Sequence, residues 1–177
     1  MIAVVRGSSG AEIQDVFEVF VGRWRDSVRL AGLIAESHGL PDRTCTAGFL
    51  RNIATGERFS IFEDLGPGST ECHLDGLGAV SAAASVERDI AAGCDVVLLS
   101  KFGKLEAAGG GLFRAFKATL DAHIPLLTSV PLTFAGPWEK LMGRSFTVLS
   151  ADLDEIGAWW QAIRKDRVVS CLASQPT

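Results

Sequence analysis

The sequence predicts a three-layer α/β fold whose mostly parallel sheet has about five strands, with one inserted antiparallel hairpin. Three observations support this fold class. Short apolar runs of strand length alternate with longer segments whose apolar residues recur at helical spacing. Glycine-rich turns stand where strands pass into helices. One pair of strand-like runs is separated by a short turn, as in a hairpin.

The N-terminal part reads as the opening of a βαβ unit. Residues 2–5 form a short apolar run, and residues 6–10 form a loop with two glycines and two serines. An apolar stripe over residues 13–28 then predicts a helix. The next apolar run, residues 30–35, should be a buried strand that lies parallel to the first through a right-handed crossover.

The hairpin is expected as an insertion at about residues 44–63. Its strand-like runs cover residues 46–53 and 58–62, and the turn between them is Ala54-Thr55-Gly56-Glu57. An antiparallel pair of this kind is compatible with a parallel sheet when it lies at an edge. We therefore place the hairpin at an edge of the sheet.

The remainder of the chain returns to the α/β alternation. The expected elements are a helix at 77–92, a strand at 96–99, a helix at 111–122, a strand at 124–130, a short helix at 134–142, a strand at 146–149 and a helix from Asp152 through Ile163. Asp152 and Glu155 stand at the spacing of a capping box. With no linker or repeat in 177 residues, we predict a single domain over residues 1–177.

Composition excludes several function classes. The chain is 47% apolar and 21% charged, as in an ordinary globular protein. Its net charge is −4 and it has no cluster of basic residues, so the sequence does not predict binding to duplex nucleic acid. No apolar run approaches the ~20 residues that span a bilayer, and the amino terminus lacks the features of a signal peptide. Four widely spaced cysteines without a CxxC pair indicate reduced thiols, so we expect a cytoplasmic protein.

The first loop, Arg6-Gly7-Ser8-Ser9-Gly10, is a candidate anion cradle. A glycine-rich turn into a helix presents backbone N–H groups and the positive end of the helix dipole. The spacing of a full P-loop then fails, because its third glycine, its lysine and its hydroxyl residue correspond to Glu12, Ile13 and Gln14. Glu12 would repel a phosphate. The alternative is a tight turn in which Glu12 stabilises the helix N-terminus.

The second candidate segment follows the apolar run at 96–99. It carries Lys101, Lys104 and Glu106 before three consecutive glycines. In open α/β sheets, ligands bind beyond the carboxyl ends of strands, so we expect this turn to face the first loop. Lys101 and Lys104 are candidates for binding an anion, and Lys101 and Glu106 are candidates for catalysis. Glu106 would orient a water or pair with Lys104; the alternative is a solvated ion pair in a turn.

Several segments together resemble the small P-loop nucleoside-triphosphatases, a kinase-like family. The resemblance covers about residues 1–130, and it rests on Ala47-Gly48-Phe49-Leu50, on Thr55-Gly56-Glu57-Arg58-Phe59 and above all on Gly103-Lys104-Leu105-Glu106. The chain is more similar still to a divergent bacterial branch of unknown function, sometimes linked to molybdenum transport. That similarity rests on residues 64–68, Asp-Leu-Gly-Pro-Gly, and on Cys72 to Asp75.

The resemblance implies a P-loop-like fold and a nucleotide or small oxyanion, phosphate or molybdate, as ligand. The family's Walker A lysine and Walker B acids correspond here to Ile13 and to Ser100-Lys101. Phosphoryl transfer needs Mg²⁺ and cationic groups, so we expect weak or absent hydrolysis, ATP or another nucleotide as a candidate cofactor, and no strong Mg²⁺ site. The alternatives are a non-catalytic regulatory module that has lost the ligand and an active nucleoside-triphosphatase with rearranged groups.

Two further groups carry open alternatives. Cys45, Cys72 and His73 would form a soft metal site if the hairpin folded back, although a structural zinc site needs a fourth ligand. A Cys45–Cys72 disulfide and a simple thiol pair beside a surface histidine are the other interpretations. The Trp159-Trp160 pair places one indole on the core, and the other would mark a homodimer contact or pack on the same chain.

Overall fold

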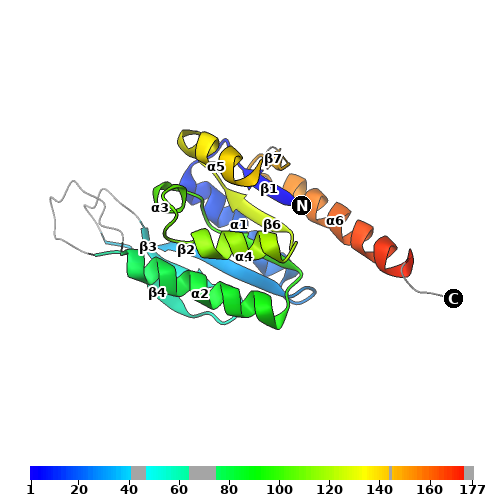
Figure 1. Cartoon of the computed structure of the whole chain (residues 1–177), viewed down its shortest axis with the longest axis horizontal. Coiled ribbons are helices and arrows are strands. Elements are labelled where there is room, and N and C mark those ends of the chain that lie inside the picture. The colour runs from blue at the N-terminus through cyan, green and yellow to red at the C-terminus, as the bar shows by residue number, and fades with distance from the viewer. Residues whose placement is uncertain (41–46, 64–74, 144, 174–177) are drawn as a thin grey trace.

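The computed structural model describes residues 1–40, 47–63, 75–143 and 145–173 (Figure 1). Within these residues a single sheet of seven strands has the order β4-β3-β2-β5-β6-β1-β7. The strands are β1 (Ile2–Val5), β2 (Leu30–Ser37), β3 (Ala47–Asn52), β4 (Arg58–Ser60), β5 (Val96–Leu99), β6 (Leu126–Ser129) and β7 (Thr147–Leu149).

The sheet is mostly parallel, and the hairpin is its antiparallel part. β1, β2, β5, β6 and β7 run parallel to one another, whereas β3 pairs antiparallel with β2, and β4 pairs antiparallel with β3. The expected total of about five strands is therefore wrong. Both strands of the hairpin join the same sheet at the free edge of β2, and they bring the total to seven.

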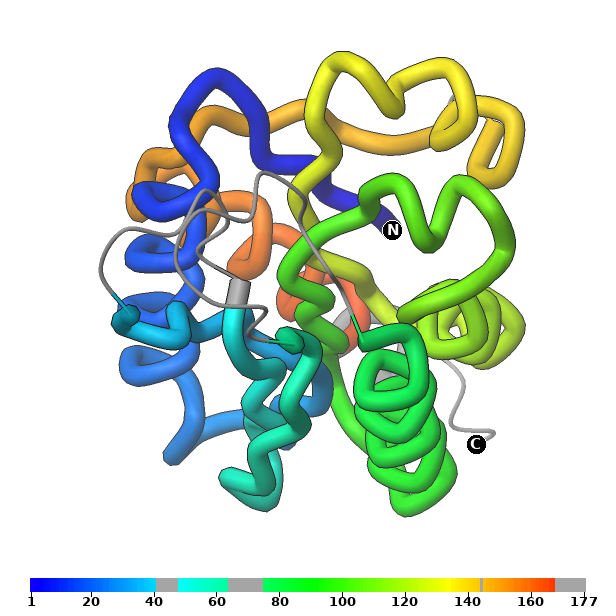
Figure 2. Tube along the Cα trace, turned by 90° about the vertical axis from the view of Figure 1, so that its left-hand side faces the viewer, coloured from blue at the N-terminus to red at the C-terminus, as the bar shows by residue number. Residues whose placement is uncertain are grey.

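Helices cover both faces of the sheet and give the predicted three layers (Figure 2). They are α1 (Gly10–Trp24), α2 (Gly76–Ala92), α3 (Lys104–Ala107), α4 (Phe113–Asp121), α5 (Ala135–Met142) and α6 (Leu153–Ala173), with a 3₁₀ turn η1 (Leu132–Phe134) before α5. In Figure 2, α1 lies to the left of the sheet, and α2 and α4 lie to its right.

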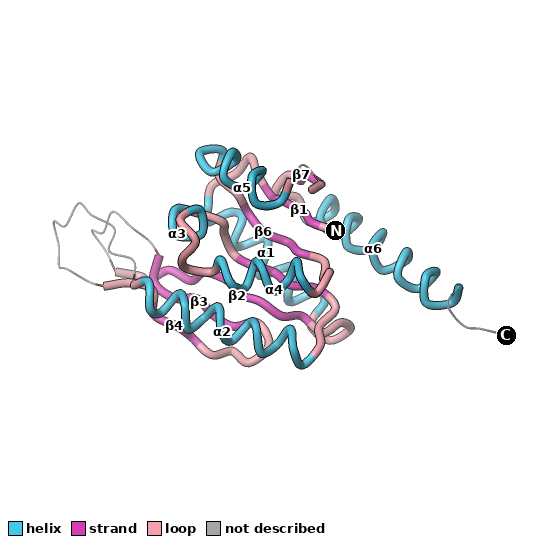
Figure 3. The backbone as a smooth tube through the Cα atoms, viewed as in Figure 1, coloured by secondary structure: helices cyan, strands magenta, loops and turns pink. Residues whose placement is uncertain are grey.

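The core has two halves, one on each face of the sheet. β5 shows why: its four residues are all buried, Val97 and Leu99 among the residues of α2 and α4, and Val96 and Leu98 among those of α1 and α6. Successive side chains of a strand point to opposite faces, so a strand buried on both sides reads as a continuous apolar run. Figure 3 shows the strands of the sheet in magenta, with helices on either side of them in cyan.

Some helices differ from the sequence-based expectation: one begins earlier, and one was not expected. α1 begins at Gly10 rather than 13, because the Ser9 side chain caps its first turn. α3 lies in a segment that we expected to be a turn. Near the other end of the chain, Trp160 is fully buried and Trp159 half-buried. In the described part of the chain, no helix combines the length and apolar character that crossing a bilayer requires.

Candidate functional site

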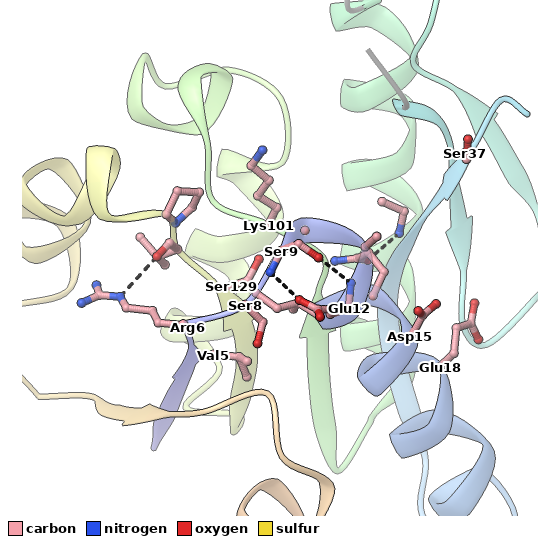
Figure 4. Close-up of a pocket in the computed structure, with 18 of the residues that line it drawn as sticks. Val5, Arg6, Ser8, Ser9, Glu12, Asp15, Glu18, Ser37, Lys101 and Ser129 are labelled. Atoms are coloured by element: carbon pink, nitrogen blue, oxygen red, sulfur yellow. Dashed lines mark hydrogen bonds between the residues drawn. The ribbon is translucent and has the colours of Figure 1, made fainter. Parts of the chain in front are cut away.

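A groove lies where the parallel strands β1 and β6 end. The chain leaves β1 toward α1 on one face of the sheet, and it leaves β6 toward η1 and α5, whose Trp138 packs on the opposite face. Neighbouring connections that diverge in this way open a crevice at the carboxyl edge of the sheet. The groove has a volume of about 1260 Å³, and it is lined by residues 5–15, 18, 35–37, 101 and 129–132 (Figure 4).

The first loop forms the floor of the groove, and Glu12 folds back over it. The Ser9 N–H donates to Glu12 Oε2 at 2.8 Å, and the Glu12 N–H donates to Ser9 Oγ at 3.3 Å, which is a capping box. These bonds from the backbone and the side chain of Ser9 lower the pKa of Glu12. The carboxylate thus occupies the Ser9 N–H, as the alternative interpretation of this loop predicts.

Other backbone donors of the loop remain open to the groove. Among the described residues, no group accepts from the N–H of Gly7, Ser8, Gly10 or Ala11. Gly7 has a φ of +89°, a conformation that glycine adopts without strain. A Cβ built on Gly7 or on Gly10 would meet no atom within 4 Å, so the backbone is accessible at both positions. This part of the loop keeps its capacity to bind an anion.

Two cationic side chains line the groove, and they differ in how they are held. Arg6 donates from Nε to the carbonyl of Val130 at 3.2 Å, and its guanidinium lies 5.8 Å from the ring centroid of Phe146. In Figure 4 its side chain points away from Ser9. Lys101 is exposed and forms no ion pair within the described residues. Of the two, Lys101 is the cation that is available to a ligand.

Gln14 and Ser129 connect the elements around the groove, and sequence reasoning had assigned a role to neither. Gln14 Nε2 donates to the Ser100 carbonyl at 3.1 Å, and Gln14 Oε1 accepts from the Ala35 N–H at 3.0 Å. Ser129 Oγ donates to the same Ser100 carbonyl at 2.8 Å. The one available signal was the pair of polar residues Thr128 and Ser129 near the end of an apolar run. No pattern in the sequence around Gln14 indicated its role, because its partners Ser100 and Ala35 are distant in the chain.

Glu106 and Lys104 lie outside the lining of the groove. Glu106 is only 8% exposed, and its two carboxylate oxygens accept from the N–H groups of Gly103 and Leu112, both at 2.9 Å. A Cβ on Gly111 would stand 2.4 Å from Glu106 Oε1. The buried Glu106 carboxylate therefore holds the two ends of the loop from 103 to 112 together through these hydrogen bonds, instead of forming a solvated ion pair with Lys104.

The end of the groove away from Arg6 is acidic. Asp15, Glu18 and Glu36 line it, and Figure 4 shows Asp15 and Glu18 on the other side of the loop from Arg6 and Ser129. Glu18 and Glu36 both bind Arg51, with Arg51 Nε 2.6 Å from Glu36 Oε1. The hydrogen bonds that Arg51 donates, first to Glu18 and then to Glu36, raise the pKa of Arg51. Asp15 has no such partner among the described residues.

Cys45, Cys72 and His73, like residues 64–68, lie outside the described residues. Among the residues that are described, no three His, Cys, Asp or Glu side chains are grouped so that they could hold a metal ion. Cys94 is buried behind α2, and burial raises the pKa of its thiol to about 11. That thiol is neutral at ordinary pH and unsuited to nucleophilic chemistry.

Comparison with known proteins adds a relative and a family. Over 110 residues the chain is 36% identical to the molybdenum import ATP-binding protein ModC 2 of Bradyrhizobium diazoefficiens. The match covers 62% of this chain and only 12% of that protein. No solved structure matches the chain. A family model described as a protein of unknown function, DUF2478, matches residues 2–159. Because this match covers most of the chain, the protein belongs to the DUF2478 family.

Proposed function

We propose that this protein binds a nucleotide or a small oxyanion in the groove, and that it hydrolyses nucleoside triphosphates weakly or not at all. The observation that carries the proposal is that the first loop and Lys101 line the same groove, and that among the described residues the N–H groups of Gly7, Ser8, Gly10 and Ala11 have no acceptor and Lys101 forms no ion pair. The described seven-stranded α/β architecture is consistent with a P-loop-like fold. The similarity to a molybdenum import ATP-binding protein supports a nucleotide as the ligand.

The anion would lie between the loop and Lys101. Backbone N–H groups at a helix N-terminus favour negative charge, and the Lys101 ammonium adds a full positive charge. A hydrogen bond between charged groups contributes about 1.5–3 kcal/mol. Glu12 opposes binding, because its carboxylate stands at the same helix terminus. Lys101 thus supplies the attraction that makes the groove a site for an anion.

The residues present do not fit the Mg²⁺ ion that a P-loop-like fold implies. Mg²⁺ requires oxygen ligands, in such sites a hydroxyl and a carboxylate. Gln14 stands at the position of the hydroxyl residue, and its side-chain oxygen already accepts from the Ala35 N–H. Lys101 stands where the strand-end acid would be. We therefore propose that the anion is bound without a metal ion, and this chemistry disfavours hydrolysis.

Calorimetric titration with ATP, ADP, phosphate and molybdate, each with and without Mg²⁺, tests the proposal. At least one ligand should bind without Mg²⁺, and Lys101→Ala should weaken that binding by about tenfold or more. Lys104→Ala is the matched control, because Lys104 lies outside the groove. Equal binding by Lys101→Ala and the wild type would contradict the proposal. Mg²⁺-dependent phosphate release that Lys101→Ala abolishes would instead indicate an active nucleoside-triphosphatase.

One observation favours a second candidate, a regulatory or interaction module without a ligand. The Glu12 carboxylate already satisfies the Ser9 N–H, which is a donor that a bound anion would use. If this internal carboxylate has replaced the ligand altogether, neither the wild type nor Glu12→Gln should bind any of the four compounds. Binding by Glu12→Gln alone would show that the cradle is intact and that Glu12 blocks it.

A further inference from the structure

The groove is larger than a site for an oxyanion alone needs. Pockets that enclose organic ligands have volumes of about 300–1,000 Å³. The volume here is about 1260 Å³, and the lining continues past the first loop in two directions. One direction leads along α1 to Asp15, Glu18 and Glu36. The other leads from the end of β6 to Pro131 and Leu132. A ligand that fills the groove therefore has an organic part.

The two ends of the groove differ in chemistry, and this decides where an organic part would lie. At the β6 end, Leu132 exposes 78% of its surface although its side chain is large and apolar. Covering it would remove apolar surface from water. At the α1 end Glu18 and Glu36 are paired with Arg51, and the Asp15 carboxylate, which has no such partner among the described residues, disfavours anionic groups. The apolar part of a ligand therefore fits the Leu132 end.

The position of the cation Lys101 decides where the anionic group of the same ligand would lie. In Figure 4, Lys101 and Ser129 lie beside Ser9, and Asp15 and Glu18 lie farther along α1. Leu132 follows Ser129 by three residues in the same segment of the chain, and Lys101 lines the same groove. A single small molecule can reach both Lys101 and Leu132.

We infer that the ligand is a phosphate monoester whose organic part is apolar, such as an aromatic ring, with its phosphate at Lys101 and the first loop and its apolar part on Leu132. The inference rests on the proposed function and makes it narrower, because it favours an organic phosphate over free phosphate or molybdate. Leu132 is then a specificity-determining residue. It contributes to affinity only when the ligand has an apolar part, whereas Lys101 contributes for every phosphate.

Three probes separate these contributions: inorganic phosphate, phenyl phosphate and AMP, titrated calorimetrically without Mg²⁺. Phenyl phosphate and AMP should each bind at least about fivefold more tightly than phosphate. Leu132→Ala should remove most of that difference and leave phosphate affinity unchanged. Lys101→Ala should weaken all three probes alike. Leu77→Ala is the matched control, since Leu77 on α2 is similarly exposed, at 80%, and lies outside the groove.

The failures of the two proposals are distinguishable. If phosphate binds and Lys101→Ala weakens it, but the ring compounds bind no more tightly, the proposed function stands and the inference is overturned. The inference is also overturned if Leu132→Ala weakens phosphate as much as phenyl phosphate, or if Leu77→Ala has the same effect as Leu132→Ala. If none of the three probes binds but ATP, ADP or molybdate does, only the inference is overturned; if none of these compounds binds either, both proposals fail. A circular-dichroism spectrum of each variant establishes that it is folded.

Discussion

The Ser129 hydroxyl donates a hydrogen bond to the Ser100 carbonyl over 2.8 Å, and it thereby ties the ends of β6 and β5 together beside the groove. Both residues are buried, and the same carbonyl also accepts from Gln14 on α1. Three elements from distant parts of the chain thus meet at one oxygen atom. Lys101 follows Ser100 directly, so this junction sets where its side chain leaves the sheet.

Removing the Ser129 hydroxyl should weaken this junction modestly. We expect Ser129→Ala to lower the free energy of unfolding by about 0.5–1.5 kcal/mol, because one buried hydrogen bond is lost while Gln14 still satisfies the carbonyl. Urea denaturation measures the change. Ser27→Ala is the control, since the Ser27 hydroxyl bonds the Trp24 carbonyl at an exposed site, and its loss should cost less than about 0.5 kcal/mol. Equal losses of stability in Ser129→Ala and Ser27→Ala would contradict the role of Ser129 in this junction.

Neutralising Glu12 should strengthen anion binding. Glu12→Gln keeps an oxygen that can accept from the Ser9 N–H, and it removes the negative charge next to the proposed anion. We expect the affinity for phosphate to rise by about threefold to tenfold. Glu139→Gln makes the same charge change at an exposed position outside the groove, and it should leave the affinity unchanged. A similar rise in both variants would mean that net charge alone is responsible.

Glu12 should also contribute to the pH dependence of stability. Its bonds to Ser9 hold its pKa below the ordinary value of 4.5, so near that pH the unfolded chain binds more protons than the folded one. The contribution of Glu12 to stability is therefore complete above this range, and it is lost as the pH falls through the folded-state pKa. The difference in urea midpoint between wild type and Glu12→Gln should shrink on acidification from pH 7 to pH 3. A pH-independent difference would contradict this assignment.

Glu106 should prove to be a structural residue of the turn that carries Lys101. Glu106→Ala leaves the buried N–H groups of Gly103 and Leu112 without acceptors, at a cost of about 1–3 kcal/mol each. Glu106→Gln should cost less, because one acceptor oxygen remains. Exposed Glu139→Ala should change stability by less than about 0.5 kcal/mol. Normal stability of Glu106→Ala, together with lost phosphate release, would instead support a catalytic role.

Gly32 should tolerate no side chain. It lies in β2 with a φ of +127°, and a Cβ there would stand 1.8 Å from the Leu98 carbonyl oxygen on β5. We expect Gly32→Ala to destabilise the fold by more than about 3 kcal/mol or to prevent folding. Gly22→Ala is the opposite case, because Gly22 is in α1 with no atom near its Cβ position, and it should raise stability by about 0.5–1 kcal/mol. Thermal unfolding of both variants checks the pair.

The elements that could be predicted from sequence are those with a strong local pattern. The strand at 96–99 is confirmed with its boundaries, because a run of four apolar residues between polar ones marks a strand buried on both faces. The hairpin is confirmed because its turn and its two β-rich runs are contiguous. The strand order was not predictable. β6 lies between β1 and β5, and no local pattern records which strands become neighbours.

In the site too, some features could be predicted from local sequence patterns and others could not. The first loop and Lys101 line one groove, as expected, because both follow carboxyl ends of parallel strands; that they bind an anion stays a prediction. The position of Glu106 could not be read from its neighbours. It depends on Gly111, whose φ of +55° turns the chain back so that the Leu112 N–H meets the carboxylate. Tertiary contacts of this kind leave no periodic signal in the sequence.

The position of β1 in the sheet has a consequence for synthesis and folding. Among the described strands, β1 pairs only with β6 and β7. The N-terminal strand can therefore join the sheet only after these two strands, more than 100 residues later in the chain, are available. Arg6 and Val130, whose side chain and carbonyl meet beside the groove, are separated by 124 residues. Contacts of such long range form late, because the intervening chain must first be ordered. On the ribosome the loop emerges before β6, and it lacks its opposite wall until β6 has been translated, so the groove forms only after that point.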